Sequence, residues 1–407
     1  MRERWQIKRI GDIAAIKPLK SEVRRRVSSD ALVSFLPMED LRITEKYACA
    51  ARTRKFLDVV GSYTYFAEGD VLLAKITPCF ENGKLGIAKG LKNGIGFGSS
   101  EFIVLRPDKT ITNEWLYYFL SREDFKSAGA QRMGGAVGHQ RVPQEFVENY
   151  PIPIPPLPEQ QRLVSILDEA FAGIAKARVN AEKNLQNTRA LFESYLQSIF
   201  TKRSKDWVET TLGAEVDILT GFPFKSARYT DTEKDVRLLR GDNIIQGELR
   251  WDDVKRWPAV NSIEYERYRL CFGDVVLAMD RPWVKAGLKR AQISPDDLPC
   301  LLVQRTARLR VKSNLNNRFL LYLISSDAFT THILGVQTGI GVPHISGQQI
   351  KDFPFIRPSV KEQHHIIEKL DSLAAETQRL ESIYQRKLAA LEELKKSLLD
   401  QAFNGAL

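Results

Sequence analysis

The feature that most constrains this chain is an internal repeat of about 203 residues. A proline-rich stretch that runs straight into a helix start, PIPIPPLPEQQRLVSIL at 151–167, recurs as PFIRPSVKEQHHIIEKL at 354–370. Proline lacks the backbone donor that a central strand needs, so the stretch is expected to be extended and not to lie inside a sheet. A repeat of this length is too long for a solenoid unit. We therefore expect one duplicated fold.

Four further pairs of segments recur in the same order, at offsets of 202–204 residues. Each copy predicts short strands, then a short amphipathic helix (113–127 and 316–331) and a glycine-rich loop, GGAVGHQ or TGIGVPH. A helix of about 40 residues, roughly 60 Å long, closes each copy. The matching segments are Trp5 and Trp207 with the residues that follow them, 34–41 and 238–244, 68–75 and 272–279, and 113–125 and 316–329.

Helices of this length need a packing partner along most of their course. Apolar residues recur at alternating spacings of three and four in the second helix, and smaller residues occupy the matching positions of the first. This pattern predicts a coil of the two helices within one chain; burial of each helix against a domain core is the alternative. The predicted helix-pairing residues are Leu167, Ala170, Ile174, Ala177 and Leu191 in the first helix and Leu370, Leu373, Leu380, Leu391, Leu394 and Leu398 in the second.

Composition points to a cytoplasmic protein with a polyanionic partner. The 407 residues are 43% hydrophobic, without an apolar run long enough for a membrane span or a secretory leader. The four cysteines are scattered, which argues against a disulfide framework or a zinc site. Of the net charge of +10, the excess lies mainly in residues 1–150, which carry 24 basic and 18 acidic side chains. DNA is a plausible partner, and an ordinary basic protein is the alternative.

No catalytic, cofactor-binding or metal site is predicted. Gly83-Lys84 lacks the remainder of a phosphate-binding loop, and His364-His365 lacks a third ligand. ITPCF at 76–80 lacks the asparagine and the second proline of the loop that holds the target amine in DNA amino-methyltransferases. The residue pattern therefore favours a binding protein.

Clusters of cations beside aromatic or glycine-rich segments are the candidates for DNA binding. Arginine and lysine can hold phosphates, and arginine can read guanine through two hydrogen bonds. Each cluster alone also fits a solvated surface. The candidate residues are Arg24, Arg25, Arg26, Arg52, Arg54, Lys55, His139, Gln140, Arg141, Lys225, Arg281, Trp283, Lys285, Gln337 and His344.

Over its whole length, the chain resembles the specificity subunits of Type I restriction–modification systems. The resemblance rests on the tandem proline-Glu-Gln-helix motif and on GDVLLAKITP, NGKLGIA, GFPFKS and LLRGDNI, which resemble the strand motifs of that family's target-recognition domains. The second copy departs from the pattern in having fewer prolines.

The resemblance implies an α+β architecture with pseudo-twofold duplication: two tandem mixed α/β target-recognition domains separated by two long helices that form an antiparallel coiled coil. The expected divisions are target-recognition domains at 1–150 and 207–352, each followed by a hinge and long helix at 151–206 and 353–407.

The same resemblance implies a non-catalytic role in DNA recognition. Each domain would read one half of a bipartite DNA site, and the helices would set the spacer and dock methyltransferase (modification) subunits. ATP-driven restriction subunits would join through these. Adenine methylation and cleavage would belong to the partners, which would bind S-adenosylmethionine, ATP and Mg²⁺. Two alternatives stay open: a stand-alone methyltransferase or nuclease, and a coiled-coil scaffold without a nucleic-acid role.

Overall fold

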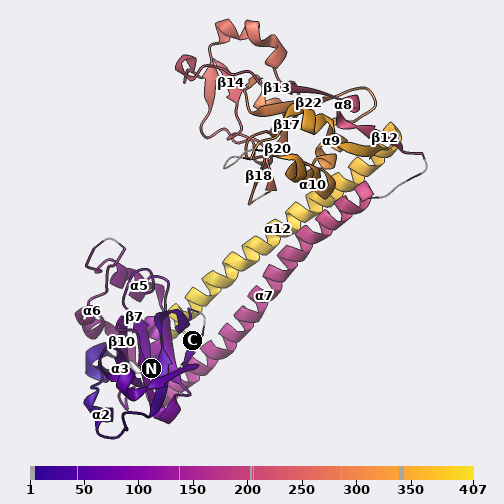
Figure 1. Ribbon diagram of the computed structural model, residues 1–407. Coiled ribbons are helices and arrows are strands. Elements are labelled where there is room, and N and C mark those ends of the chain that lie inside the picture. The colour runs from indigo at the N-terminus through magenta and orange to yellow at the C-terminus, as the bar shows by residue number, and fades with distance from the viewer. Residues whose placement is uncertain are drawn as a thin grey trace. The chain divides into compact units, whose positions relative to one another are not determined.

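The computed structural model describes residues 5–43, 45–136, 138–201, 204, 206–285, 287–338 and 343–407. It divides into two compact units: unit 1 consists of Met1–Glu182 and Gln385–Leu407, and unit 2 of Lys183–Tyr384. Each unit contains a mixed-sheet domain, the beginning of one long helix and the end of the other (Figure 1). The long helices are α7, Leu157–Thr201, and α12, Val360–Phe403.

Unit 1 contains three sheets, with strand orders β1-β11, β2-β10-β7-β8-β4 and β5-β3-β9-β6. The strands are β1 Gln6–Arg9, β2 Ala14–Ile16, β3 Leu32–Leu36, β4 Tyr47–Cys49, β5 Arg52–Lys55, β6 Thr64–Ala67, β7 Val71–Ala74, β8 Leu85–Lys89, β9 Ile95–Gly98, β10 Phe102–Pro107 and β11 Pro151–Ile154. The short helices are α1 Ile10–Ile13, α2 Ser21–Arg24, α3 Phe56–Val60, α4 Asn113–Leu120, α5 Glu123–Ala130 and α6 Gln144–Asn149, with 3-10 turns η1 Met38–Asp40 and η2 Lys92–Gly94.

Unit 2 repeats this plan with the orders β12-β23, β13-β22-β17-β20-β15 and β16-β14-β21, the last of which corresponds to β5-β3-β9 of unit 1. It adds the pair β18-β19. Its strands are β12 Val208–Thr211, β13 Val216–Thr220, β14 Val236–Leu239, β15 Gln246–Gly247, β16 Lys255–Trp257, β17 Val275–Ala278, β18 Trp283–Val284, β19 Gly287–Leu288, β20 Arg290–Gln292, β21 Cys300–Leu302, β22 Thr306–Val311 and β23 Pro354–Arg357. Its short helices are α8 Leu212–Glu215, α9 Asn317–Leu323, α10 Asp327–Val336 and α11 Gly347–Lys351, with η3 Ser226–Arg228, η4 Ala259–Tyr268 and η5 Pro295–Asp297.

The predicted short amphipathic helix is two helices in each copy. In unit 1 the chain leaves the helix at Ser121 and Arg122, between α4 and α5. In unit 2 the break falls before α10, whose first turn is capped by the Ser326 hydroxyl, an acceptor for the Phe329 amide at 3.3 Å. A serine that caps a new helix competes with continuation of the old one. Among the described residues no single helix is long and apolar enough to span a membrane; only the bent pair α9 and α10 has the required length and composition.

The proline stretches form strands of two-stranded sheets. β11 pairs antiparallel with β1, with Pro153 opposite Ile7, and β23 pairs in the same way with β12. In a two-stranded sheet each strand has one unpaired edge, and that edge tolerates residues without a backbone donor. The extended conformation expected from the prolines is therefore present, but it is part of a sheet and not a free linker.

The long helices lie together in each unit and run antiparallel. In unit 1 the Arg178 side chain of α7 meets Glu392 of α12 at 2.5 Å, and in unit 2 Arg189 of α7 meets Glu381 of α12 at 2.7 Å. Leu167 and Leu370, both predicted on the seam, are fully buried. Two other predicted seam residues, Leu191 and Leu394, are instead 63% and 47% exposed.

The phase of the seam changes along α7. The less exposed positions after Ala181 are Leu185, Thr188 and Phe192, so a second spacing of four follows the one from Ala177 to Ala181. An α-helix has 3.6 residues per turn, so a strict seven-residue repeat drifts off the contact face and an added step of four restores it. After this second spacing of four, Phe192 and not Leu191 lies on the contact face, so the prediction for Leu191 was wrong. The pairing role of the remaining predicted residues stays a prediction.

The end of each long helix completes a domain core. In unit 1 the ring of Phe403, in α12, lies 4.1 Å from that of Trp115, in α4. In unit 2 the ring of Phe200, in α7, lies 5.5 Å from that of Phe319, in α9. These pairs occupy matching positions of the repeat, and Trp115, Phe319 and Phe403 are almost completely buried.

The recurring Gly-Asp-Val of 68–75 and 272–279 is a structural motif. Gly69 and Gly273 have φ of +83° and +86°, a conformation that favours glycine. The next residue is a buried aspartate: Asp70 binds Arg106 at 2.7 Å, and Asp274 binds Arg310 at 2.7 Å. Burial raises the pKa of the Asp70 carboxyl, while hydrogen bonding to that carboxylate raises the pKa of the Arg106 guanidinium. Each pair joins two neighbouring central strands.

Asp274→Ala should destabilise unit 2, because it leaves the Arg310 guanidinium, whose side chain is only partly exposed, without its carboxylate. We expect a loss of about 2–3 kcal/mol, since a fully buried pair costs roughly 3–5 kcal/mol to break. Hydrogen exchange of the β17 and β22 amides in the full chain measures it.

The matched control is Glu376→Ala, which removes the partner of Arg379 from an exposed pair on α12. An exposed ion pair contributes about 0–1 kcal/mol, so exchange should scarcely change in that variant. Equal effects of both substitutions would contradict the structural role of the motif.

Candidate nucleic-acid interface

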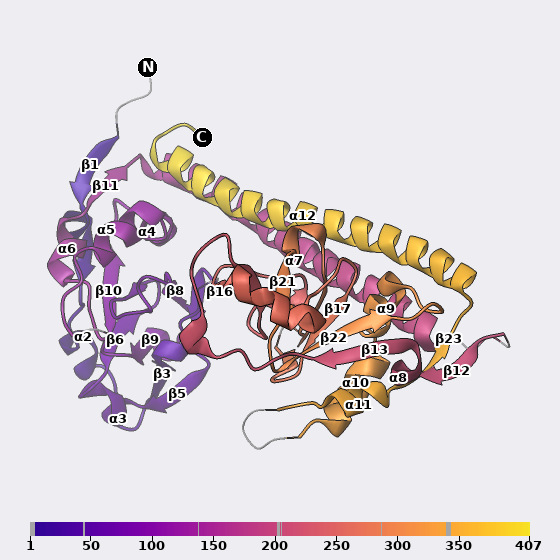
Figure 2. The same ribbon diagram turned by 90° about the horizontal axis from the view of Figure 1, so that it is seen from above.

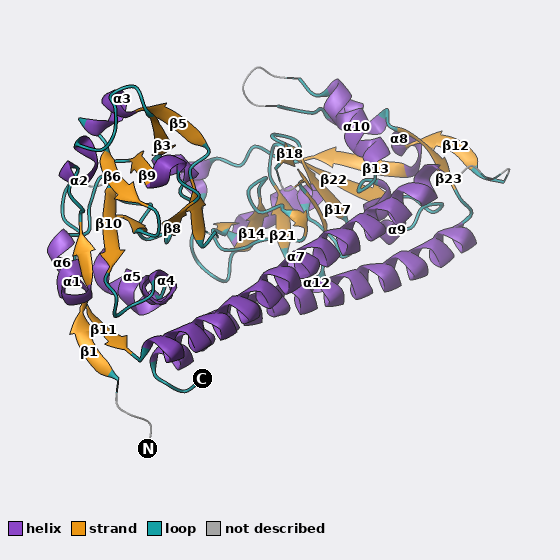
Figure 3. Ribbon diagram, turned by 90° about the horizontal axis from the view of Figure 1, so that it is seen from below, coloured by secondary structure: helices purple, strands orange, loops and turns teal. Residues whose placement is uncertain are grey.

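In unit 1, α2, α3 and the four-stranded sheet share one small core. Val23 of α2, Phe35 of β3 and Phe56 of α3 are all buried in it. Both Figure 2 and Figure 3 show α2, α3 and β5 at the same end of the domain. This core presents two of the predicted cationic clusters, residues 24–26 and 52–55, on its surface.

The cations of these two clusters differ in how far they are already neutralised. All are exposed. Arg52 meets Asp40 at 2.8 Å, and Lys55 meets Asp30 at 3.3 Å. The Arg54 guanidinium stacks over the Phe35 ring, with 4.0 Å to the ring centroid, and has no carboxylate partner among the described residues. Within the described part of the chain, no ion pair involves Arg24, Arg25 or Arg26 either, so these four arginines are the available cations.

The glycine-rich loop of unit 1 returns to the end of β7. Arg141 pairs with both Gly134 and Ile76 through backbone bridges. Its guanidinium makes two hydrogen bonds to Glu101, at 2.9 and 2.8 Å, and this contact lowers the pKa of the Glu101 carboxyl. The charge of Arg141 is therefore already neutralised by Glu101, and the residue holds the loop in place. His139, two residues before it, is exposed.

The equivalent loop of unit 2 takes part in a second cluster, which is centred on Asp280. His344 bridges to Thr338 and to Asp280, and its Nδ1 lies 2.6 Å from Asp280 Oδ1. The Arg305 Nη1 reaches the same oxygen at 3.2 Å. The Pro343 carbonyl accepts a hydrogen bond from the Arg281 amide at 2.7 Å, so the loop and the segment after β17 are held together. The loop residues 339–342 lie outside the described part.

Sequence reasoning missed Arg305 in this cluster. Arg305 and Arg281 both have a positive φ, of 68° and 45°, which is uncommon for residues other than glycine. Backbone strain of this kind concentrates at functional sites. Trp283, on β18, and Lys285 are exposed nearby in sequence, while Gln337 is half-buried. No spacing in the sequence relates position 305 to 280.

The predicted residues thus fall into separate groups. His344 and the missed Arg305 converge on Asp280, and the Arg281 amide binds the loop that carries His344. Arg24–Arg26 and β5 lie on the surface of the small core of unit 1. Lys225 precedes η3 and is exposed, with no described contact to either group. The structure gives no contact of these side chains with a ligand, so their role in DNA binding stays a prediction.

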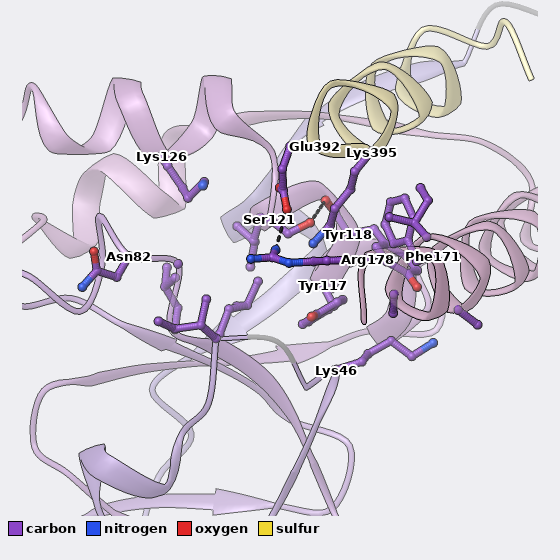
Figure 4. A pocket seen from close by; sticks show the side chains of 18 of the residues that line it. Lys46, Asn82, Tyr117, Tyr118, Ser121, Lys126, Phe171, Arg178, Glu392 and Lys395 are labelled. Carbon is purple, nitrogen blue, oxygen red and sulfur yellow. Dashed lines mark hydrogen bonds and ion pairs between the residues drawn. The ribbon is translucent and has the colours of Figure 1, made fainter. Parts of the chain in front are cut away.

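Unit 1 also holds a cavity of about 430 Å³ between the domain and the two helices (Figure 4). The charged side chains Arg178 and Glu392 on its rim are paired with each other. Burial raises the pKa of the Tyr117 hydroxyl at its wall to about 12. In the described residues no group of three or more histidine, cysteine, aspartate or glutamate side chains is placed to hold a metal ion.

Comparison with known proteins identifies the family to which this architecture belongs. The Type I restriction modification DNA specificity domain matches residues 2–183 and 265–390. The EcoAI specificity subunit of Escherichia coli is 31% identical over 98% of this chain and 82% of its own length. The MjaVIII specificity subunit of Methanocaldococcus jannaschii is 27% identical over all of this chain and 93% of its own.

Two solved structures share the fold at 18% identity. One was described under the subject of complex assembly and conformational transition of the type I R-M system, and has a TM-score of 0.80 with 100% and 99% coverage. The other, the HsdS subunit from Thermoanaerobacter tengcongensis, has a TM-score of 0.65 with 100% and 98% coverage. The α+β fold with two mixed-sheet domains and two packed long helices is therefore confirmed. The chain belongs to the Type I restriction–modification specificity subunits and is the non-catalytic, DNA-specificity component of such a system.

Proposed function

We propose that residues 1–150 and 207–352 are two target-recognition domains that each read one half of a bipartite DNA site. Residues 151–206 and 353–407 are then the hinges and helices that set the spacer between the halves. The observation that carries this proposal is the duplication: both domains join their helix through the same short sheet and receive the end of the other helix in the same place. Two equivalent readers suit two separated half-sites.

The partners follow from the same plan. Two methyltransferase subunits dock on the helices, one for each copy of the repeat, and ATP-dependent restriction subunits join through them. S-adenosylmethionine, ATP and Mg²⁺ belong to those subunits. The relative described in the context of the assembly of a type I R-M system supports this arrangement. The four free cysteines suit a reducing compartment, so we place the function in the cytoplasm.

The DNA-facing surfaces are those whose cations lack a carboxylate partner. In unit 1 these are Arg24, Arg25, Arg26 and Arg54. In unit 2 Arg305 already pairs with Asp280, so among the described residues the exposed Arg281 is the available cation of that cluster. Free cations gain most from phosphate because no existing ion pair has to be broken. The His344 ring belongs to the unit 2 cluster, and the exposed Trp283 follows Arg281 by two residues in the sequence.

Exchange of residues 1–150 for the equivalent domain of another specificity subunit should change one half of the methylated sequence and leave the other half and the spacer unchanged. The reason is that each domain core is built within its own unit. Methylome sequencing of cells that carry the hybrid complex measures this. A change in both halves would contradict two independent readers.

Two assays with purified protein test the alternatives. A stand-alone enzyme predicts methylation or cleavage of DNA by the purified chain with S-adenosylmethionine or Mg²⁺ alone. A scaffold without a nucleic-acid role predicts no DNA shift even with methyltransferase subunits present. Either result would replace the proposal.

Replacement of Arg24, Arg25 and Arg26 by glutamine should weaken DNA binding and flatten its salt dependence. Each lost phosphate contact lowers the slope of log K against log salt by about 0.9. The measurement is a salt titration of duplex binding by the complex. Arg52→Gln with Lys55→Gln is the matched control, because both cations already pair with carboxylates. An unchanged slope in the triple variant would show that these arginines are only solvated surface.

Insertion of seven residues into both α7 and α12 should lengthen the spacer and keep both half-sites. Seven residues add about 10 Å of helix, which is roughly three base pairs at 3.4 Å each. The methylated sequences report the spacer directly. If the spacer stayed the same in an assembled complex, the helices would not be its measure.

A further inference from the structure

Each long helix begins with a completely buried glutamine. Gln160, in the first turn of α7, and Gln363, in the first turn of α12, are both 0% exposed. A buried primary amide has two N–H donors and a carbonyl acceptor that must all find partners, since an unpaired buried polar group costs free energy. The partners of these glutamines therefore have to be built into the fold.

Gln160 binds three backbone atoms from two segments. Its Nε2 donates to the carbonyl oxygens of Thr110, at 2.9 Å, and Pro155, at 2.8 Å. Its Oε1 accepts from the Thr112 amide at 2.9 Å. Thr110 and Thr112 belong to the domain, immediately before α4, and Pro155 belongs to the hinge. One side chain thus joins domain, hinge and long helix.

Gln363 repeats this arrangement bond for bond. Its Nε2 donates to the carbonyl oxygens of Asn314, at 2.9 Å, and Pro358, at 3.0 Å. Its Oε1 accepts from the Asn316 amide at 2.9 Å. The domain residues differ between the copies, threonines in one and asparagines in the other, but the bonded atoms are all backbone atoms.

A second attachment lies eight residues further along each helix. Asp168 of α7 accepts from the Tyr118 hydroxyl and binds Lys46 at 2.6 Å, beside the cavity seen in Figure 4. Asp371 of α12 accepts from the Tyr322 hydroxyl at 2.5 Å. Burial, followed by the aspartate contact, raises the pKa of both tyrosines. Eight residues are about 12 Å of helix, and two fixed points on a rod define its direction.

The direction of the helix has a large effect at its far end. A helix of 45 residues is about 67 Å long, so a tilt of roughly 5° at one end moves the other by about 6 Å. That displacement corresponds to roughly two base pairs at 3.4 Å each. A ruler accurate to one base pair therefore needs a joint held to within a few degrees.

We propose that Gln160 and Gln363 are positioning residues that determine the spacer length accepted by the protein, by fixing the angle between each domain and its helix. This inference rests on the proposed function. The angle between domain and helix depends mainly on the hydrogen bonds of the glutamine amide. The hinge prolines contribute a carbonyl oxygen that any residue at position 155 or 358 supplies.

The test uses the complex of the full chain with its methyltransferase subunits. Methylation rates are measured on duplexes whose half-sites are separated by the natural spacer and by one base pair more or less. Gln160→Met keeps an unbranched side chain of similar length and removes all three hydrogen bonds. The matched control is Gln161→Met, the exposed neighbour on the same helix turn.

The preference of Gln160→Met for the natural spacer should fall at least tenfold, while its choice of half-site bases is unchanged. Gln161→Met and Pro155→Ala should keep the wild-type preference. If Gln160 had a purely structural role, Gln160→Met would lower the methylation rates on the three spacer lengths by the same factor and leave the ratio of these rates unaltered. An assembled Gln160→Met complex with the wild-type ratio overturns the inference, as does an effect of Pro155→Ala as large as that of Gln160→Met.

Gln160→Glu provides a second variant with a pH signature. Burial raises the pKa of a carboxyl group, and the protonated carboxyl at position 160 can donate one hydrogen bond. The ionised carboxylate has no donor, and it faces the carbonyl oxygens of Thr110 and Pro155. Spacer preference should therefore be lower at about pH 8.5 than at about pH 6.5 in this variant alone. A preference that does not depend on pH overturns the inference.

Two further outcomes would also contradict the inference. If neither Gln160 variant assembles although Gln161→Met does, the glutamine is a folding requirement and not an angular device. If the wild-type complex itself does not discriminate among spacers, the proposed function fails, and the inference fails with it.

Discussion

Neither domain of this protein has a complete core without the end of a helix that starts in the other copy of the repeat. Phe403 closes the core of unit 1 against Trp115, and Phe200 closes that of unit 2 against Phe319. Burial of an aromatic side chain of this size contributes about 2–3 kcal/mol, a large share of the stability of a domain. Folding of each domain and pairing of the helices are therefore coupled.

Electrostatics separates structural cations from available ones. Arginines that lie beside a strand carboxylate, such as Arg106 and Arg310, hold the central sheets together. Arg141, which the glycine-rich loop presents next to His139, is likewise neutralised by Glu101. Only after these are removed from the total does the charge of the chain describe a surface that phosphate can use.

Much of the architecture was predictable from the sequence because it is repeated. The offset of about 203 residues predicted the duplicated α+β plan, and the proline-Glu-Gln motif predicted the start of each long helix. The contacts of Gln160 were beyond prediction, because all its partners are backbone atoms, two of them 48 and 50 residues away, and no side-chain pattern encodes them. Arg305 was missed for a related reason: a fold brings it to Asp280, while the sequence places 25 residues between them. Leu191 was misplaced because a seven-residue template does not allow for the added step in α7.

The two contacts that attach each domain to its helix differ in kind: the glutamine binds backbone atoms of the domain, whereas Asp168 and Asp371 bind tyrosine side chains of the domain. The glutamine amide accepts whatever residue stands at positions 110 and 112, or 314 and 316, provided that the main chain keeps its course. The residues at these four positions can therefore change without a compensating change in the glutamines, whereas the tyrosines that bind Asp168 and Asp371 have to be kept. At these positions the sequence of a domain can vary while the hydrogen bonds that attach it to its helix stay the same.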